Sequence, residues 1–214
     1  MLESAIVNLR RRKQIKEFFD SNSDARSKYY SLLDENLSSK KLKESMTKLI
    51  EQDPDFYDSY EVVADILIDE GEVQEALKIL YQGFQRAMKR IVDREGNFPE
   101  KIEWGWLENR HVVRIINRWA LELWDQGKPQ EALEILRKIL KSNPNDNIGV
   151  RYSILAINLG LKSDFEEKFE HKENPDYLNA ADLIDWFYKH FRKFPDEFAW
   201  WYKIVDGEDI TKTK

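Results

Sequence analysis

Apolar and polar residues alternate with a helical period along most of this chain of 214 residues. Two stretches, Ala64–Leu80 and Ala120–Leu136, each carry an apolar helix face up to a glycine and resume the pattern two or three residues later. Gly71 and Gly127 are suited to end the first helix, and Pro129 suits the first turn of a second one. The pattern therefore predicts a hairpin of two helices in each stretch.

The two stretches are also related to each other in sequence. ADILIDEGEVQEALKIL and ALELWDQGKPQEALEIL align without a gap and share ten identities in seventeen positions. One helix hairpin cannot bury its apolar face alone, so repeated hairpins are expected to stack on their neighbours. The chain is therefore interpreted as an array of helical repeats.

The order of small residue, large residue, glycine, alanine and closing proline resembles the tetratricopeptide repeat, whose period is about 34 residues. In that register, repeats begin at Ser23, Tyr57, Val113 and Asn147, so the interval within each pair is 34 residues. The middle interval is 56 residues, which leaves an insertion of about 22 residues near 91–112. The resemblance implies an all-α fold, a right-handed superhelical array of about four antiparallel helix hairpins.

The first and fourth repeats depart from this pattern. Tyr30 and Ile154 stand where alanine is preferred, and Glu166 replaces the second alanine of the last repeat. Terminal repeats of such arrays are commonly atypical. The segments WGWLENR, at 104–110, and NPNDNIGVRY, at 143–152, resemble elements of a subgroup of repeat proteins, and this second resemblance implies no particular activity.

The segments that flank the repeats differ from them in composition. We expect a leading helix over 1–22, repeats over 23–180, an aromatic helical cap over 181–206 and a frayed tail over 207–214. Ten of the 27 aromatic residues lie between Tyr177 and Tyr202. They would either cover the open end of the last repeat or form an exposed docking surface, and we favour the cap.

Net charge and composition narrow the classes of function. A formal charge of -6 and a pI near 5.3 argue against general affinity for nucleic acid, which requires a basic surface. The alternative is a regulatory protein that contacts nucleic acid through basic residues of the leading helix, namely Arg10, Arg11, Arg12, Lys13 and Lys16. The chain has no cysteine, no apolar run approaching the roughly 18 residues of a membrane span, and no secretion signal at its start. We therefore expect a cytoplasmic protein without membrane contact.

The stretch SNPNDNIG, at 142–149, is rich enough in oxygen ligands to suggest a metal site. A calcium loop requires glycine at its sixth position and glutamate at its twelfth, and both positions hold isoleucine when counted from Asn143. A turn explains the same residues, because a left-handed Asn143 and Pro144 would end one helix while Asp146 or Asn147 caps the next. The stretch is predicted to be a turn, with no metal bound.

Motifs of enzymes and cofactor sites are missing from the sequence. It contains no phosphate-binding glycine loop, nucleophile elbow or His-Glu-x-x-His, and its three histidines are His111, His171 and His190. Glu108 and His111 are one helical turn apart, which suits an ordinary surface contact better than an acid-base pair. Hydrolase or transferase activity in the insertion stays a third possibility that would require an ordered pocket. We expect no catalytic residue and no cofactor.

A candidate binding surface follows from the resemblance, because certain positions on the first helix of each tetratricopeptide repeat line a concave groove. These positions and their neighbours are Asp58, Glu61, Asp65, Asp69, Arg110, Arg114, Asn117, Arg118, Trp124, Arg151 and Asn158. The groove would be acidic at the second repeat and basic at the third and fourth. The alternative is a solvated charged face without a binding role.

Part of this set is similar to the carboxylate clamp with which some tetratricopeptide proteins hold chaperone tails. Arg114 and Arg118 match two of its cationic positions, whereas the other three fall on Ser27, Ser31 and Val62 and lack the required cation and asparagines. The sequence therefore predicts a non-catalytic scaffold or adaptor that binds a peptide or partner helix, without identifying that partner.

Overall fold

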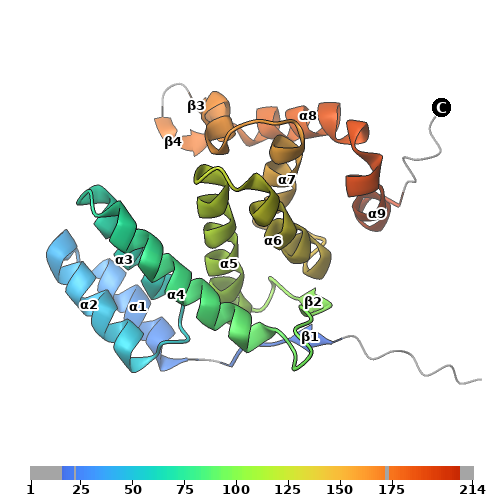
Figure 1. The fold of residues 1–214 in the computed structure, drawn as a ribbon. Coiled ribbons are helices and arrows are strands. Elements are labelled where there is room, and N and C mark those ends of the chain that lie inside the picture. The colour runs from blue at the N-terminus through green and yellow to red at the C-terminus, as the bar shows by residue number, and fades with distance from the viewer. Residues whose placement is uncertain (1–15, 22, 172–173, 208–214) are drawn as a thin grey trace, which may run out of the picture.

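In a computed structural model, which describes residues 16–21, 23–171 and 174–207, the chain is mostly helical and consecutive helices pack against each other (Figure 1). The α-helices are α1 (Asp24–Asp34), α2 (Ser39–Gln52), α3 (Asp58–Asp69), α4 (Val73–Ile91), α5 (Leu107–Asp125), α6 (Pro129–Ser142), α7 (Val150–Asn158), α8 (Ala180–His190) and α9 (Pro195–Val205). The shorter elements are the 3₁₀ helices η1 (Ser163–Phe169) and η2 (Phe191–Lys193) and the strands β1 (Glu17–Phe18), β2 (Lys101–Ile102), β3 (Glu170–His171) and β4 (Asn174–Leu178).

The two hairpins predicted from the repeated sequence are α3–α4 and α5–α6, so that prediction is confirmed. Gly71 and Gly127 adopt left-handed conformations, with φ of +81° and +76°. The residue after each glycine donates a hydrogen bond to a carbonyl in the last turn of the preceding helix. The Glu72 N–H donates to the Leu67 carbonyl at 2.8 Å, and the Lys128 N–H makes the equivalent bond in the second hairpin at 2.8 Å.

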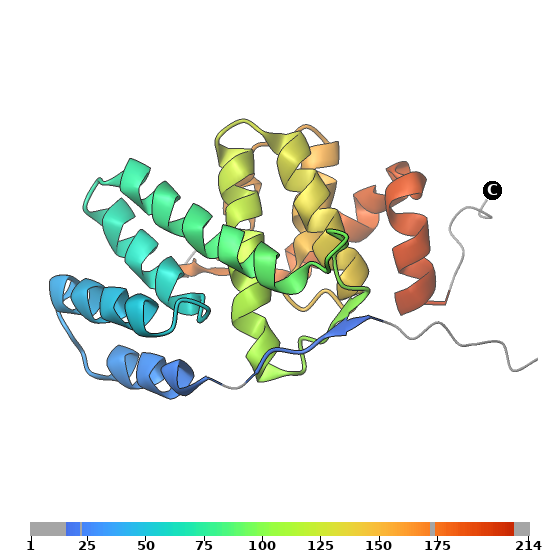
Figure 2. The ribbon, with the colours of Figure 1, turned by 60° about the horizontal axis from the view of Figure 1, so that its bottom comes forward.

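Small residues allow these helices to approach closely. The alanines of the repeat pattern are fully buried between helices, and they are Ala64, Ala76, Ala120 and Ala132. Gly83 lies within α4, where a Cβ atom would stand 3.0 Å from the Tyr60 ring and 3.1 Å from Ile115. Glycine at this helix position therefore permits α4 to pack between α3 and α5. The three pairs α1–α2, α3–α4 and α5–α6 follow one another in Figure 2.

The fourth predicted repeat does not form a complete hairpin of α-helices, which corrects the expected four. Its first helix is α7, and the chain then passes through Gly160, with φ of +71°, into the seven-residue 3₁₀ helix η1. The antiparallel pair β3–β4 follows directly. Glu166 stands where the pattern calls for a buried alanine, and burial of a carboxylate is costly, so a regular second helix is not favoured here.

The predicted leading helix is corrected over the part of it that the structure describes. Residues 1–15, which include Arg10, Arg11, Arg12 and Lys13, lie outside the described residues. The chain from Lys16 is extended, and β1 pairs in parallel with β2 through Glu17 with Lys101 and Phe18 with Ile102. This short strand is held by a segment far away in sequence, which a helical periodicity cannot indicate.

Most of the predicted insertion near 91–112 extends neighbouring helices or supports β1. Helix α4 continues to Ile91, and α5 begins at Leu107, six residues before the expected start of its repeat at Val113. Between them, Ile102 of β2 is 2% exposed and the Ser142 hydroxyl donates to the Pro99 carbonyl. Pro99 and Ile102 therefore join the packed core, whereas residues 94–97 of the same segment are exposed.

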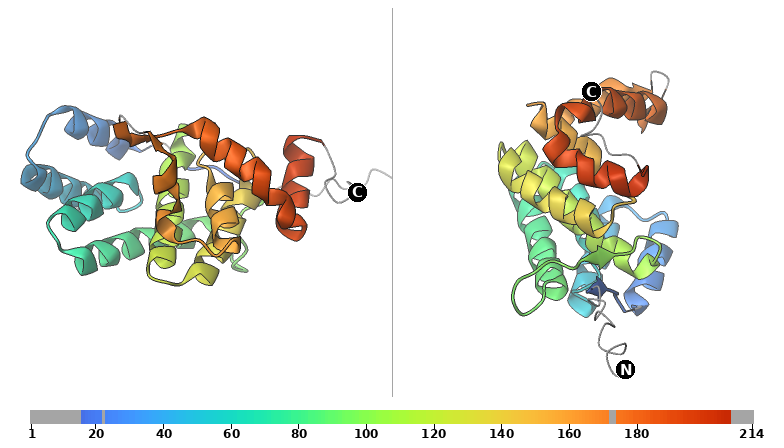
Figure 3. Two further views of the ribbon diagram at one scale, coloured as in Figure 1. Left: turned by 90° about the horizontal axis from the view of Figure 1, so that it is seen from above. Right: turned by 90° about the vertical axis from the view of Figure 1, so that its right-hand side faces the viewer.

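The C-terminal segment expected to form one capping helix forms two α-helices. Helices α8 and α9 are joined by η2 and lie at the end of the molecule opposite α1 and α2 (Figure 3). Phe187, Phe191 and Phe198 are fully buried, and the Trp201 Nε1–H donates to the Pro144 carbonyl at 2.8 Å. Over the ranges that the structure describes, no helix is long and apolar enough to cross a membrane.

Candidate functional site

The acidic residues of α3 and the basic residues of α5 meet directly. Arg114 binds Asp58 with two nitrogens, and its Nε donates to Asp58 Oδ1 at 2.8 Å. Asp58 is 4% exposed and lies in the first turn of α3, where the helix dipole favours a negative charge. A paired guanidinium and carboxylate of this geometry fixes the spacing of the two helices.

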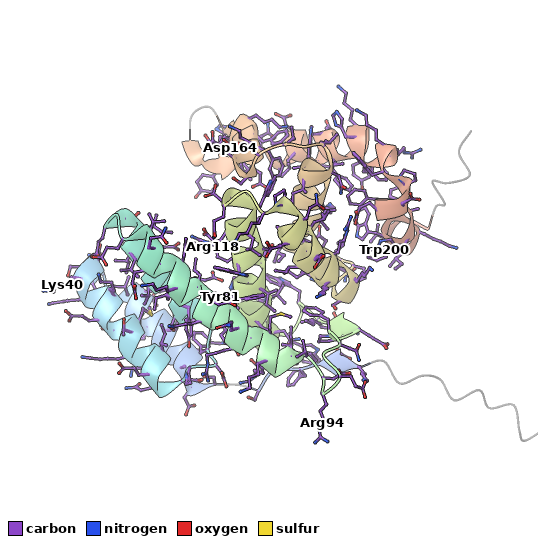
Figure 4. All side chains as sticks on the ribbon, in the orientation of Figure 1. Lys40, Tyr81, Arg94, Arg118, Asp164 and Trp200 are labelled. Carbon is purple, nitrogen blue, oxygen red and sulfur yellow. The ribbon has the colours of Figure 1, made fainter. Side chains whose placement is uncertain are left out.

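A second ion pair joins the same helices one turn further along. Arg118 lies between α3 and α5 (Figure 4), with its Nη2 3.0 Å from Asp65 Oδ1 and its Nε 2.8 Å from Glu122 Oε1. The sequence predicted a groove with an acidic end and a separate basic end. In the structure, the acidic residues of α3 and the basic residues of α5 lie side by side and form ion pairs. Each positive side chain is matched to a negative one on the neighbouring helix.

Glu61 lies between these pairs and has an unusual environment. Its Oε1 atom is buried and has no hydrogen-bond partner among the described residues. Burial, followed by the negative charge of Asp58, raises the pKa of Glu61 to about 8, although Arg114 and Arg118 act in the opposite direction. The carboxyl group is therefore mostly protonated and uncharged at neutral pH.

A small cavity of about 80 Å³ opens beside the Asp58–Arg114 pair, between α1, α3 and α5. We call it the arginine pocket, and its lining residues are Arg26, Tyr30, Asp58, Leu107, Arg110, His111 and Arg114. Arg26 Nη1 lies 3.2 Å from Glu108 Oε1, so Glu108 pairs with α1. Glu108 therefore contacts Arg26 and does not make the expected surface contact with His111.

Two of the side chains that line the arginine pocket are large, mainly apolar and exposed to solvent. Tyr30 is 51% and Leu107 is 54% exposed. Trp106 precedes Leu107 and is 50% exposed, and its ring makes an edge contact with Phe19 at 5.2 Å between centroids. Exposed apolar groups gathered in this way are typical of binding surfaces. We call the combined surface of α1, α3 and α5 the first-helix face.

Other predicted groove residues lie away from the first-helix face or contribute little to it. Trp124 is 5% exposed and packs on Phe165 of η1, with ring centroids 5.6 Å apart. The Asn158 side chain donates to the Ile154 carbonyl at 2.8 Å and lies near α9. Asp69 is exposed at the end of α3, and Asn117 is half-buried on α5.

Arg151 takes part in the turn at SNPNDNIG instead of facing a groove. Its Nη1 donates to Asp146 Oδ2 at 2.8 Å, and its guanidinium lies 4.1 Å from the Tyr152 ring centroid. Asp146 Oδ1 accepts from the Val150 N–H at 2.8 Å, so of the two predicted capping residues, Asp146 and Asn147, Asp146 binds the start of α7. Asp146 has the left-handed conformation expected of Asn143, with φ of +50° against -137°.

A buried polar network around His111 was not predicted. His111 Nε2 is 2.9 Å from Asp20 Oδ2, and its Nδ1 accepts from the Tyr57 N–H at 3.0 Å, so the neutral imidazole donates from Nε2. Burial raises the pKa of Asp20, but the bond from His111 and the charge of Arg90 outweigh it, so this pKa is lowered. The Asn109 side chain completes the network by accepting from the Asp20 N–H at 2.9 Å.

This network fastens the extended N-terminal segment to α4 and α5 and uses both nitrogens of His111. The sequence carried no signal for it, because its members are scattered from 20 to 111. Arg26 and Leu107 of the arginine pocket were also missed as site residues. The sequence did offer a signal for Tyr30, because this large residue stands where the repeat pattern prefers alanine.

The described residues contain no group of three or more histidine, aspartate or glutamate side chains placed to hold a metal ion. Comparison of the chain with models of known protein families, with curated proteins and with solved structures finds no match.

Proposed function

We propose that the protein is a non-catalytic helical-repeat scaffold of the tetratricopeptide kind, which binds a peptide or helix of a partner protein on its first-helix face. One observation carries the proposal. Helices α1 and α3 are both joined to α5 by ion pairs, Arg26–Glu108 for α1 and Asp58–Arg114 and Asp65–Arg118 for α3, and exposed apolar groups lie near these charges. A right-handed superhelical continuation of this stacking would make the face concave. Preorganised side chains lower the entropic cost of binding a partner.

The sequence features at the base of the proposal are the two matching hairpins and the 34-residue intervals from Ser23 to Tyr57 and from Val113 to Asn147. The alternative, contact with nucleic acid through basic N-terminal residues, gains no support from Lys16. Its Nζ lies 2.5 Å from Asp93 Oδ2, so this cation is already paired.

The test is a quantitative affinity capture from native lysate with two matched baits. Changing Tyr30→Glu and Ile68→Glu together places charge on exposed positions of α1 and α3, and should reduce specific captured proteins at least about tenfold, which corresponds to ~1.4 kcal/mol. The control Val73→Glu changes an exposed residue of α4, on the second helix of its hairpin, and should capture as the parent chain does.

Two results would contradict the proposal. One is that both variants and the parent chain capture the same proteins in the same amounts. The other is that capture disappears on nuclease treatment and falls steeply with salt, which would favour the nucleic-acid alternative.

A further inference from the structure

Arg110 is held in place by contacts that leave its two terminal nitrogens unused. Its Nε donates to the Trp104 carbonyl at 3.0 Å, and its guanidinium carbon lies 5.2 Å from the centroid of the Trp104 ring. Within the described part of the chain, neither Nη1 nor Nη2 of Arg110 makes a hydrogen bond or an ion pair. A guanidinium fixed in this way presents a planar pair of donors that matches a carboxylate.

The charges around the arginine pocket favour an anion. Three arginines line it, against a single carboxylate, that of Asp58. His111 also lines the pocket, and it uses both of its ring nitrogens in contacts with Tyr57 and Asp20. Arg26 and Arg114 already have acidic partners, so Arg110 is the guanidinium best placed to bind an incoming group.

The size of the pocket limits what that group can be. A cavity of about 80 Å³ accommodates a few water-sized groups. A carboxylate at the end of a short side chain fits this space, whereas a nucleotide does not. Exposed Tyr30 and Leu107 line the pocket and offer apolar contact area beside its charged groups.

Resting on the proposed function, we infer that the arginine pocket recognises an acidic residue in the partner peptide. An aspartate or glutamate side chain inserts its carboxylate between Arg110 and Arg26, and an adjacent leucine, phenylalanine or tryptophan of the peptide packs on Tyr30 and Leu107. The partner sequence is thus defined by an acidic residue next to a large apolar one. The apolar contact supplies buried area, and the carboxylate supplies specificity.

The experiment starts from random peptides displayed on phage and selected on the immobilised full chain. Recovered peptides should carry aspartate or glutamate beside leucine, phenylalanine or tryptophan. A synthetic copy of one such peptide, labelled with fluorescein, then serves as the probe in fluorescence polarisation. Arg110→Gln should weaken its binding at least about tenfold, ~1.4 kcal/mol, and replacing the peptide's acidic residue by its amide should do the same.

A double-mutant cycle tests whether these two groups contact each other. If they do, amidating the peptide should have little further effect on Arg110→Gln, because the interaction is already lost. Leu107→Glu is a second variant, chosen because an exposed glutamate at the start of α5 is compatible with the helix and would repel the peptide's carboxylate. Arg94→Gln is the matched control, since Arg94 is exposed and points away from the body of the molecule (Figure 4).

The outcomes separate this inference from the proposed function. Selected peptides without acidic residues, or additive effects of Arg110→Gln and the amide, would overturn the inference while leaving a peptide-binding scaffold in place. Recovery of no peptide, together with a capture experiment that shows no dependence on the first-helix face, would overturn both. Melting curves of each variant establish that lost binding does not come from unfolding.

Discussion

At the scale of single residues, Glu61 shows how burial changes the charge of a side chain. Its sequence position suggested an acidic stripe, yet burial raises its pKa to about 8. The neighbouring carboxylate of Asp58 adds to this effect, and the two arginines of α5 do not fully offset it. The first-helix face is therefore less acidic at neutral pH than its composition implies.

This raised pKa predicts a pH dependence of stability. From about pH 4.5 to about pH 8 the folded state holds a proton on Glu61 that the unfolded state releases, so the free energy of unfolding falls as pH rises. Glu61→Gln removes this dependence. The free energy of unfolding of Glu61→Gln, relative to that of the parent chain, should increase with pH by at most ~1.4 kcal/mol per pH unit. Urea unfolding at several pH values measures this difference.

Asn117→Ala is a suitable control for that measurement. It alters a half-buried residue of the same face without removing a titrating group, so its stability should run parallel to that of the parent chain. Parallel curves for Glu61→Gln and the parent would show that the pKa of Glu61 is not raised.

At the scale of elements, β1 depends on one side chain of α5. Asn109 is fully buried, and it accepts from the Asp20 N–H while donating to the carbonyls of Phe18 and Glu103. The side-chain amide of Asn109 thus binds three backbone groups, two in the N-terminal segment and one after β2. This amide and the Asp20–His111 pair therefore act together with the β1–β2 pairing to hold the extended segment in place.

We expect Asn109→Ala to lower the free energy of unfolding by about 1–3 kcal/mol, because it leaves buried backbone groups without partners. Urea unfolding measures the loss, and Asn117→Ala on the same helix should cost much less. Amide hydrogen exchange should also become faster at Asp20. Equal unfolding midpoints for the two alanine variants would contradict this role of Asn109.

At the scale of the whole molecule, α8 and α9 pack near α7 at one end of the series of helices. Phe187 makes an edge contact with Tyr152 of α7 at 5.6 Å between centroids, and Trp201 reaches the turn that precedes α7. An array of hairpins leaves an apolar face open at its end, which must be covered to avoid association.

A chain that ends at Asn174 should therefore expose the apolar side of α7, bind a hydrophobic dye and aggregate. Light scattering and dye fluorescence measure the two effects. Because deletion is a large change, Phe198→Ala provides a milder version, with an expected loss of about 3–5 kcal/mol. Ile204→Ala, at a residue that is 61% exposed, is its control. A truncated chain that stayed monomeric and bound no dye would show that these aromatics do not act as a cap.

Local patterns predicted the parts of the structure that depend on neighbouring residues. Both repeated hairpins, their glycine turns and the cap at Asp146 follow from short stretches whose residues interact within a few positions. Resemblance to a repeat family added the idea of a common first-helix face. It also placed Trp124, Arg151 and Asn158 on that face. In the structure, these side chains instead contact C-terminal elements, Trp124 on η1 and the other two on α9.

The sequence by itself thus determined the two repeated hairpins and their glycine turns, because periodicity and turn chemistry act over short distances. Only the tertiary structure decided that Asp58 and Asp65 pair with arginines of α5, that Asp20 reaches His111, and that β1 is a strand. Each of these contacts joins residues far apart in the chain, and nothing near either residue encodes its partner. The charge of Glu61 and the free donors of Arg110 likewise follow from packing, which sets the solvent and the neighbours that each side chain meets.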